Sequence, residues 1–208
     1  MMLTNTPQLS SIFANQKLSS IVPKQPVKAA ELSLFVVSLV HFLITGSIQS
    51  LPGAQNDFQF ISFVNQVLTL TDVSISSVIL SLKYIQMLGT KISLLGSRGS
   101  EYRIWLTALM LADIFLNDNA FTTKSWAEAS GIPATDIAIQ KREFLFGLNF
   151  KLKIQDDEYC LWLSILESFL NQIAIMNNQY NQFSQSRFQQ QNRSVSRMIS
   201  HAGVHVRI

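Results

Sequence analysis

The chain has little of the material on which secreted or disulfide-bonded proteins depend. Its 208 residues include one cysteine, Cys160, together with 5 prolines and 8 glycines. A single cysteine excludes a disulfide framework, argues against a cysteine-based zinc site and fits a reducing compartment. The first residues lack the charged segment, apolar segment and cleavage site of a secretory signal. We therefore expect an intracellular protein, in the nucleus, the cytoplasm or both.

Histidine is also scarce, and the common catalytic motifs are missing. His41 lies in an apolar segment, whereas His201 and His205 form a pair that lacks a third metal ligand. The sequence contains no phosphate-binding P-loop, no dinucleotide fingerprint and no nucleophile elbow. The three consecutive acids at 156–158 do not share one helical face, and they suit the start of a helix better than a metal site. We expect no enzymatic activity, no cofactor and no metal site.

Acidic residues are absent from both ends of the chain. Residues 1–30 carry three lysines and residues 168–208 carry four arginines, with no acid in either segment. Residues 31–167 carry nine Lys or Arg against thirteen Asp or Glu, so the net charge of +3 comes from the ends. Because phosphate neutralisation dominates nucleic-acid affinity, nucleic acid is not an expected partner of the acidic central part.

What is present is a series of apolar segments between two polar ends. Residues 1–28 and 178–208 are rich in Ser, Asn and Gln, with arginines in the second segment, and we expect a disordered leader and a disordered tail. Residues 29–46 predict a helix whose apolar core, 32–44, is shorter than the roughly 20 residues that span a bilayer. A buried helix is the favoured interpretation, and a membrane anchor is the alternative.

Helical periodicity recurs through the middle of the chain, and no segment has a strand pattern. The pattern predicts one all-α domain over 29–177, with a loop at 47–57 and a turn at 96–100. The expected helices are 29–46, 58–70, 76–89, 103–118, 124–129, about 133–149 and 156–177. The residues placed to cap helix ends are Ser74 or Ser76, Gly89, Thr122 or Thr123, and Gly131.

The helix at 103–118 is apolar on most sides and has one narrow polar stripe. The polar residues on this side are Arg103, Thr107, Asp113, Asn117 and Asp118. Met110 and Ile114 lie within the same stripe. The other directions are filled by Ile104, Trp105, Leu106, Leu109, Leu111, Phe115 and Leu116. Either another helix covers the stripe, or Met110 and Ile114 are the apolar centre of a partner interface with a polar rim.

The motifs around this helix resemble those of the fungal Pcl-type cyclins and their relatives around cyclin Y. The matching residues are Leu82-Lys83-Tyr84-Ile85, Arg103-Ile104, Leu111-Ala112, Leu116-Asn117-Asp118, Lys124-Ser125-Trp126, Gly131, Arg142-Glu143-Phe144-Leu145, Leu148, Phe150 and Leu152. The resemblance covers about 58–154 and implies one five-helix cyclin box. Residues 29–46 would be an extra helix before the box, and 156–177 an extra helix after it.

The resemblance implies a regulatory subunit that binds and activates a cyclin-dependent serine/threonine kinase by packing on its mobile αC helix and activation region. No small-molecule substrate or membrane partner is expected. The candidate contact residues are Met110, Ile114, Asn117, Asp118, Lys124 and Lys141. The family usually has Lys where Ile114 stands and an acid where Lys141 stands. Lys141 would repel a basic partner surface that an acid would attract.

Three other interpretations stay open from the sequence. The first is a cyclin-fold scaffold or transcription-factor-like binding module without kinase activation, although promoter-binding relatives resemble two tandem boxes with a zinc ribbon. The second is a membrane-tethered adaptor, which would depend on the apolar segment 32–44. The third is an all-α enzyme, for which the sequence offers no nucleophile, base or metal cluster.

Overall fold

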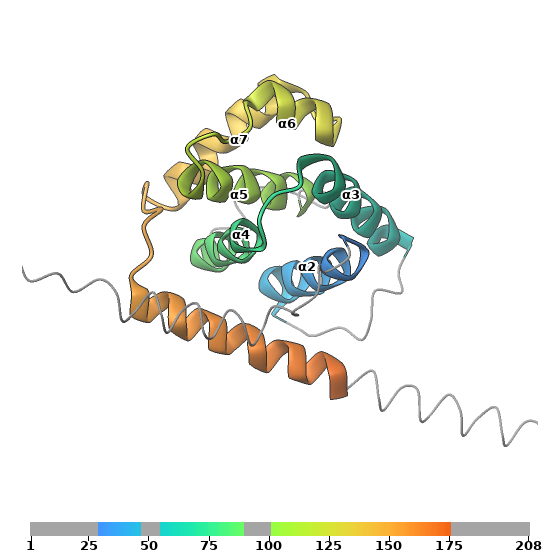
Figure 1. Cartoon of the computed structure of the whole chain (residues 1–208), viewed down its shortest axis with the longest axis vertical. Coiled ribbons are helices and arrows are strands. Elements are labelled where there is room, and N and C mark those ends of the chain that lie inside the picture. The colour runs from blue at the N-terminus through green and yellow to red at the C-terminus, as the bar shows by residue number, and fades with distance from the viewer. Residues whose placement is uncertain (1–28, 47–54, 90–100, 176–208) are drawn as a thin grey trace, which may run out of the picture. The chain divides into compact units, whose positions relative to one another are not determined.

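The computed structural model describes residues 29–46, 55–89 and 101–175 (Figure 1). The predicted leader 1–28, the turn 96–100 and the predicted tail 178–208 lie outside the described residues. The chain divides into two units, one ending at Ile165 and the other beginning at Leu166. The contacts described below belong to the first unit.

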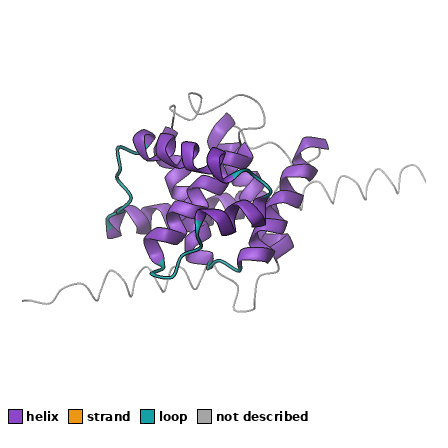
Figure 2. Ribbon diagram, turned by 90° about the horizontal axis from the view of Figure 1, so that it is seen from above, coloured by secondary structure: helices purple, strands orange, loops and turns teal. Residues whose placement is uncertain are grey.

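Every regular element in the described ranges is a helix, as Figure 2 shows. The elements are α2 (Ala29–Thr45), α3 (Gln55–Thr71), α4 (Ile75–Leu88), α5 (Glu101–Leu116), α6 (Thr123–Ser130), α7 (Ala134–Gly147) and a helix over 156–175. The all-α prediction is confirmed, with five helices, α3 to α7, between an extra helix before them and another after them. The boundaries move by a few residues, and α3 begins inside the segment 47–57 that was expected to be a loop.

Local capping chemistry accounts for several of the helix ends. Ser74 is the N-cap of α4, and its hydroxyl oxygen accepts from the backbone N–H of Ser77 at 3.1 Å. Thr122 does the same for α6 through the N–H of Ser125, also at 3.1 Å. Gly131 ends α6 in the left-handed region, with φ 72°, where a side chain would be strained. Residue type alone predicted Gly131 and left Ser74 or Ser76, and Thr122 or Thr123, as the N-caps, of which the structure has Ser74 and Thr122.

Helix α5 lies at the centre of the five helices α3 to α7, here called the box, and contacts α3, α4 and α7 (Figure 1). Its residues 104–113 are all buried, including the polar side chains of Thr107 and Asp113. Neighbours on several sides explain why its sequence is apolar in most directions rather than along one stripe. Among the helices of the described ranges, none combines the length and apolar character needed to cross a membrane.

A buried ion pair joins α4 to the first turns of the helix 156–175. The Lys83 Nζ, on a side chain 8% exposed, lies 2.9 Å from Glu158 Oε1. The same ammonium donates to Gln86 Oε1 at 3.0 Å and lies 5.7 Å from the centre of the Trp162 ring. The indole N–H of Trp162 donates to the carbonyl of Ile79 at 3.2 Å. We call Lys83, Glu158 and Trp162 the Lys83 junction.

The linker between α7 and the next helix is held at the same place. The Tyr84 hydroxyl donates to the carbonyl of Leu152 at 2.9 Å, and its ring is fully buried. Burial raises the pKa of Tyr84 well above its usual range, because the phenolate would lose its hydration. Lys151 Nζ lies 3.9 Å from Glu158 Oε2. The linker is therefore anchored to α4 by a hydrogen bond and to the helix 156–175 by charge.

Candidate partner-binding surface

The C-terminal end of α5 carries a group of exposed apolar side chains with a polar border. Ile114, Phe115 and Leu116 are 41%, 44% and 45% exposed, and Phe121 in the following turn is 41% exposed. Asn117, Asp118 and Asn119 are also exposed. Because Ile114, Phe115 and Leu116 are consecutive, their side chains surround the end of the helix rather than share one side of it. Exposed apolar side chains with polar neighbours are typical of a protein interface. We call Ile114, Phe115, Leu116, Asn117, Asp118 and Phe121 the α5-end face.

The turn that carries half of this face is anchored on Asp113, which is buried in the last turn of α5. Its carboxylate oxygens accept from the side-chain amide of Asn117 and, at 3.4 Å, from the backbone N–H of Phe121. The backbone N–H of Asn117 continues the helix to the carbonyl of Asp113 at 2.9 Å. One buried side chain thus reaches both ends of the turn.

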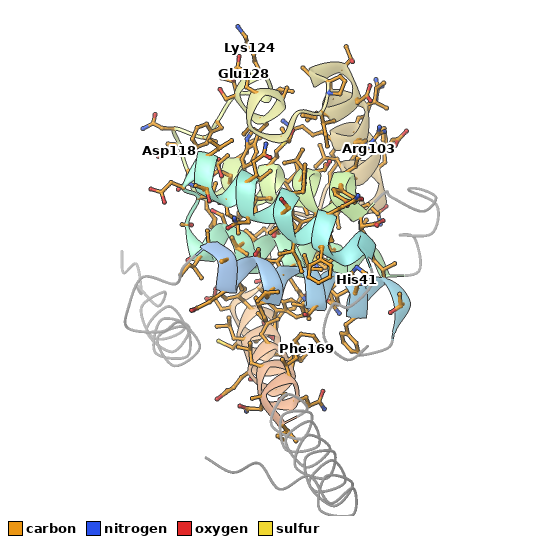
Figure 3. All side chains as sticks on the ribbon, turned by 90° about the vertical axis from the view of Figure 1, so that its right-hand side faces the viewer. His41, Arg103, Asp118, Lys124, Glu128 and Phe169 are labelled. Carbon is orange, nitrogen blue, oxygen red and sulfur yellow. The ribbon has the colours of Figure 1, made fainter. Side chains whose placement is uncertain are left out.

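Helix α6 contacts the α5-end face through Phe121. Its Trp126 is fully buried, and the ring of Phe121 meets it edge to face with centroids 5.8 Å apart. The Gln66 amide of α3 donates to the carbonyl of Ala129 at 3.1 Å, which ties the end of α6 to the box. Lys124 is exposed in the first turn of α6, and Figure 3 shows it near Glu128, with Arg103 and Asp118 on opposite sides of the molecule.

The structure corrects the predicted stripe along α5. Thr107, Met110 and Asp113 are buried, so the expected exposure of Met110 is wrong, and its side chain is not available to a partner. Helix α7 packs on α5, and the Thr107 hydroxyl lies 3.5 Å from Gln140 Oε1. The expected burial of Phe115 and Leu116 is also wrong, because unbroken burial along α5 ends at Asp113.

The register of α5 and α7 places the remaining candidates. Arg103 and Asp136 form an exposed ion pair at 3.5 Å, and Thr107 contacts Gln140, so both pairs have the same separation in sequence. The two helices therefore run in the same direction, and their C-terminal ends lie at the same end of the pair. This register puts the half-buried Lys141 level with residue 108, about 9 Å before Ile114 along the helix axis.

A second apolar group projects from the C-terminal end of α7. Phe146 and Phe150 are each 60% exposed, and their rings meet edge to face at 5.2 Å. Asn149 and Phe150 both have positive φ, 52° and 57°, which is uncommon for an aromatic residue. Sequence reasoning missed this pair and also Phe115, Leu116 and Phe121 as surface residues. The available signal was the run of three apolar residues directly before Asn117-Asp118-Asn119.

The described residues offer no group for metal chemistry: no three or more His, Cys, Asp or Glu side chains are placed to hold an ion. A shallow depression between α5 and α7 is lined by Arg103, Ile104, Thr107, Gln140, Glu143 and Phe144. Three of the six predicted contact residues, Ile114, Asn117 and Asp118, belong to the α5-end face. Lys124 lies just beyond the turn, Lys141 lies further along the helix pair, and Met110 is buried.

Comparison with known proteins agrees with this architecture. The family model for cyclins matches residues 55–152, which include α3 to α7. PHO85 cyclin-5 of Saccharomyces cerevisiae is 33% identical over 108 residues, which cover 49% of this chain and 47% of that protein. The chain thus spans about half the length of the curated relative that it matches. No solved structure matches it significantly. The resemblance to the cyclin family and its Pcl-type members is confirmed.

Proposed function

We propose that this chain, whose residues 55–152 match the family model for cyclins, is a regulatory subunit that binds and activates a cyclin-dependent serine/threonine kinase. The name PHO85 cyclin-5 associates that relative with PHO85, which makes PHO85 the first partner to test. The proposal places the protein where such a kinase works, in the nucleus or the cytoplasm. It assigns no reacting group to this chain.

The observation that carries the proposal is the α5-end face. Ile114, Phe115 and Leu116 are consecutive apolar residues that remain exposed at the end of the central, otherwise buried helix of the domain. Exposed apolar side chains of this size lose contact with water when a partner covers them, and each contributes favourably to association. Asn117 and Asp118 would supply polar contacts at the border of the same face.

The mechanism is a shift between two kinase conformations. A subunit that packs on the mobile αC helix and activation region binds the active arrangement more tightly than the inactive one, and so raises its population. In the active arrangement the kinase's own Lys–Glu pair and metal-binding Asp are aligned for phosphoryl transfer. All the chemistry belongs to the kinase, and this chain contributes differential binding energy.

Lys124 and Lys141 belong to the rim of this proposal. Lys124 is exposed and Lys141 is half-buried, and neither forms an ion pair with a described residue. Rim charges act mainly on association rate and salt dependence rather than on the lifetime of the complex. Partner surfaces with acidic groups opposite Lys141 would therefore associate faster than basic ones.

The experiment compares the affinity of PHO85 and other cyclin-dependent kinases for the unchanged chain and for two variants. Ile114→Glu places a charge in the apolar centre, and Asp118→Arg reverses the border charge. We expect Ile114→Glu to weaken binding about thirtyfold, as truncation of a central interface residue does, and Asp118→Arg to weaken it less. Kinase activity should fall in parallel.

Leu70→Glu is the matched control. Leu70 is an exposed apolar residue in the last turn of α3, as Ile114 is in the last turn of α5, so both changes add the same charge to the same kind of helix end. Leu70→Glu should leave kinase affinity unchanged. Unchanged affinity in both Ile114→Glu and Asp118→Arg would sink the proposal.

A further inference from the structure

Asp113 is an acidic residue in an unfavourable position. It is 3% exposed and lies in the last turn of α5, where the helix dipole disfavours negative charge. No Lys, Arg or His of the described residues forms a salt bridge with it. A buried charge without an opposite charge is costly, and hydrogen bonds to it must compensate for the lost hydration.

Both carboxylate oxygens are engaged by the same short stretch of chain. Oδ1 accepts from the amide of Asn117, and Oδ2 lies 3.4 Å from the backbone nitrogen of Phe121. These donors lie four and eight residues after Asp113, at the start and near the end of the turn between α5 and α6. In Asn one of these two positions would be an NH2 group, which would face a donor instead of accepting from it.

The turn held in this way carries the polar half of the α5-end face. Asn117 and Asp118 are exposed, and Phe121 projects its ring partly into solvent over the buried Trp126. Thr122, the next residue, is the N-cap of α6, so the turn is fixed from both sides. Exposed side chains that are already ordered lose less conformational freedom when a partner binds.

We propose that Asp113 is a positioning residue: its buried carboxylate orders the turn 117–122 and so presents Asn117, Asp118 and Phe121 to the partner. This inference depends on the proposed function, because the turn is taken to contact the kinase. Asp113 itself touches no partner atom. Its contribution is pre-organisation of the face, which acts on affinity rather than on the composition of the interface.

The test combines three measurements on Asp113→Asn and on the unchanged chain: hydrogen exchange at the Phe121 amide, affinity for the kinase, and the midpoint of thermal unfolding. We expect exchange at Phe121 to rise about tenfold as the turn opens more often. Affinity should fall about three- to tenfold, the loss that follows when one or two side chains must be ordered on binding.

Thr71→Val is the control for a loss of stability alone. Thr71 is also buried in the last turn of a helix, where its hydroxyl donates to the carbonyl of Val67 at 2.7 Å. This variant should lower the unfolding midpoint and leave both the exchange at Phe121 and the affinity unchanged. Where Asp113→Asn fails to fold, Asn117→Ala removes one donor from the surface side. Asn117 is itself a proposed contact, so only its effect on Phe121 exchange counts.

Two results would overturn the inference. Unchanged exchange at Phe121 in both Asp113→Asn and Asn117→Ala means that the carboxylate does not order the turn. Faster exchange with unchanged affinity means that Asp113 serves the turn alone. Failure of the proposed function has a separate signature, since Ile114→Glu would then bind the kinase as the unchanged chain does, while the exchange measurements would still report on the turn.

Discussion

Lys83 and Asp113 are both buried charges in the same domain, and their surroundings are opposite. Lys83, 6% exposed, meets a carboxylate from Glu158, an amide oxygen and the face of Trp162. Asp113, 3% exposed, accepts from the neutral amides of Asn117 and Phe121, and within the described ranges it forms no salt bridge. The first charge is neutralised by a partner of opposite sign, and the second is not.

The difference separates a structural site from one next to a proposed functional surface. The Lys83 junction joins α4 to the helix that follows the box, and opposite charge, aromatic packing and hydrogen bonds all act together there. At Asp113 no Lys, Arg or His of the described residues supplies a compensating charge, and the carboxylate lies beside the exposed α5-end face. Sites that depart from the most stable arrangement are often found next to functional surfaces. Four changes test whether this contrast is real.

Lys83→Glu has the largest expected effect. It puts two carboxylates side by side in a largely buried place and removes the cation over Trp162, and breaking a buried pair costs about 3–5 kcal/mol. Because Glu158 is 32% exposed, we expect the free energy of unfolding to fall by about 3 kcal/mol, measured by chemical denaturation. Adding Glu158→Lys should recover more than half of the loss, and no recovery would mean that charge pairing is not what holds the junction.

Tyr84→Phe should lower the free energy of unfolding by about 1.5 kcal/mol at neutral pH, because the carbonyl of Leu152 loses its donor. The folded-state pKa of Tyr84 is raised by burial, so the tyrosine contributes stability below its ordinary pKa of about 10 and loses it as the pH rises further. Denaturation between about pH 8 and pH 11 should therefore show the unchanged chain losing its advantage over Tyr84→Phe. A constant difference across this range would contradict the assignment.

Thr122→Ala should lower the free energy of unfolding by about 1 kcal/mol, because the backbone N–H of Ser125 in the first turn of α6 loses the hydroxyl that accepts from it. Thermal unfolding measures the loss. Thr122→Ser keeps the capping hydroxyl and should behave nearly as the unchanged chain does. Equal losses in the two variants would show that the methyl group, and not the cap, is what stabilises the end of the turn.

Asp113→Asn is expected to have the smallest effect on stability, within about 1 kcal/mol. Removal of an uncompensated anion from the negative end of a helix offsets the weakened contact to Phe121. Chemical denaturation of this variant beside Lys83→Met gives the sharpest form of the comparison, because each change removes one buried charge. Equal losses at the two positions would remove the distinction between them.

Much of the fold was predictable because it depends on local chemistry. Ser74 and Thr122 begin helices through hydrogen bonds to residues three positions later, and Gly131 ends one in the left-handed region, so these signals lie in adjacent sequence. The acids at 156–158 were assigned to a helix start, where the structure places them. The pairing of Glu158 with Lys83 could not be predicted, because it joins residues from distant parts of the chain.

The candidate surface was only partly predictable, and α5 shows why. Its apolar sequence by itself determined a central helix of an all-α domain, and its motifs determined the resemblance to the cyclins. Which residues stay exposed was decided by the packing of later and earlier segments: α7 contacts Thr107, Met110 is buried, and Ile114, Phe115 and Leu116 are left in solvent. Hydrophobic periodicity indicates which side chains are suited to burial. Which of them are buried depends on segments distant in sequence that pack against the helix only in the tertiary structure.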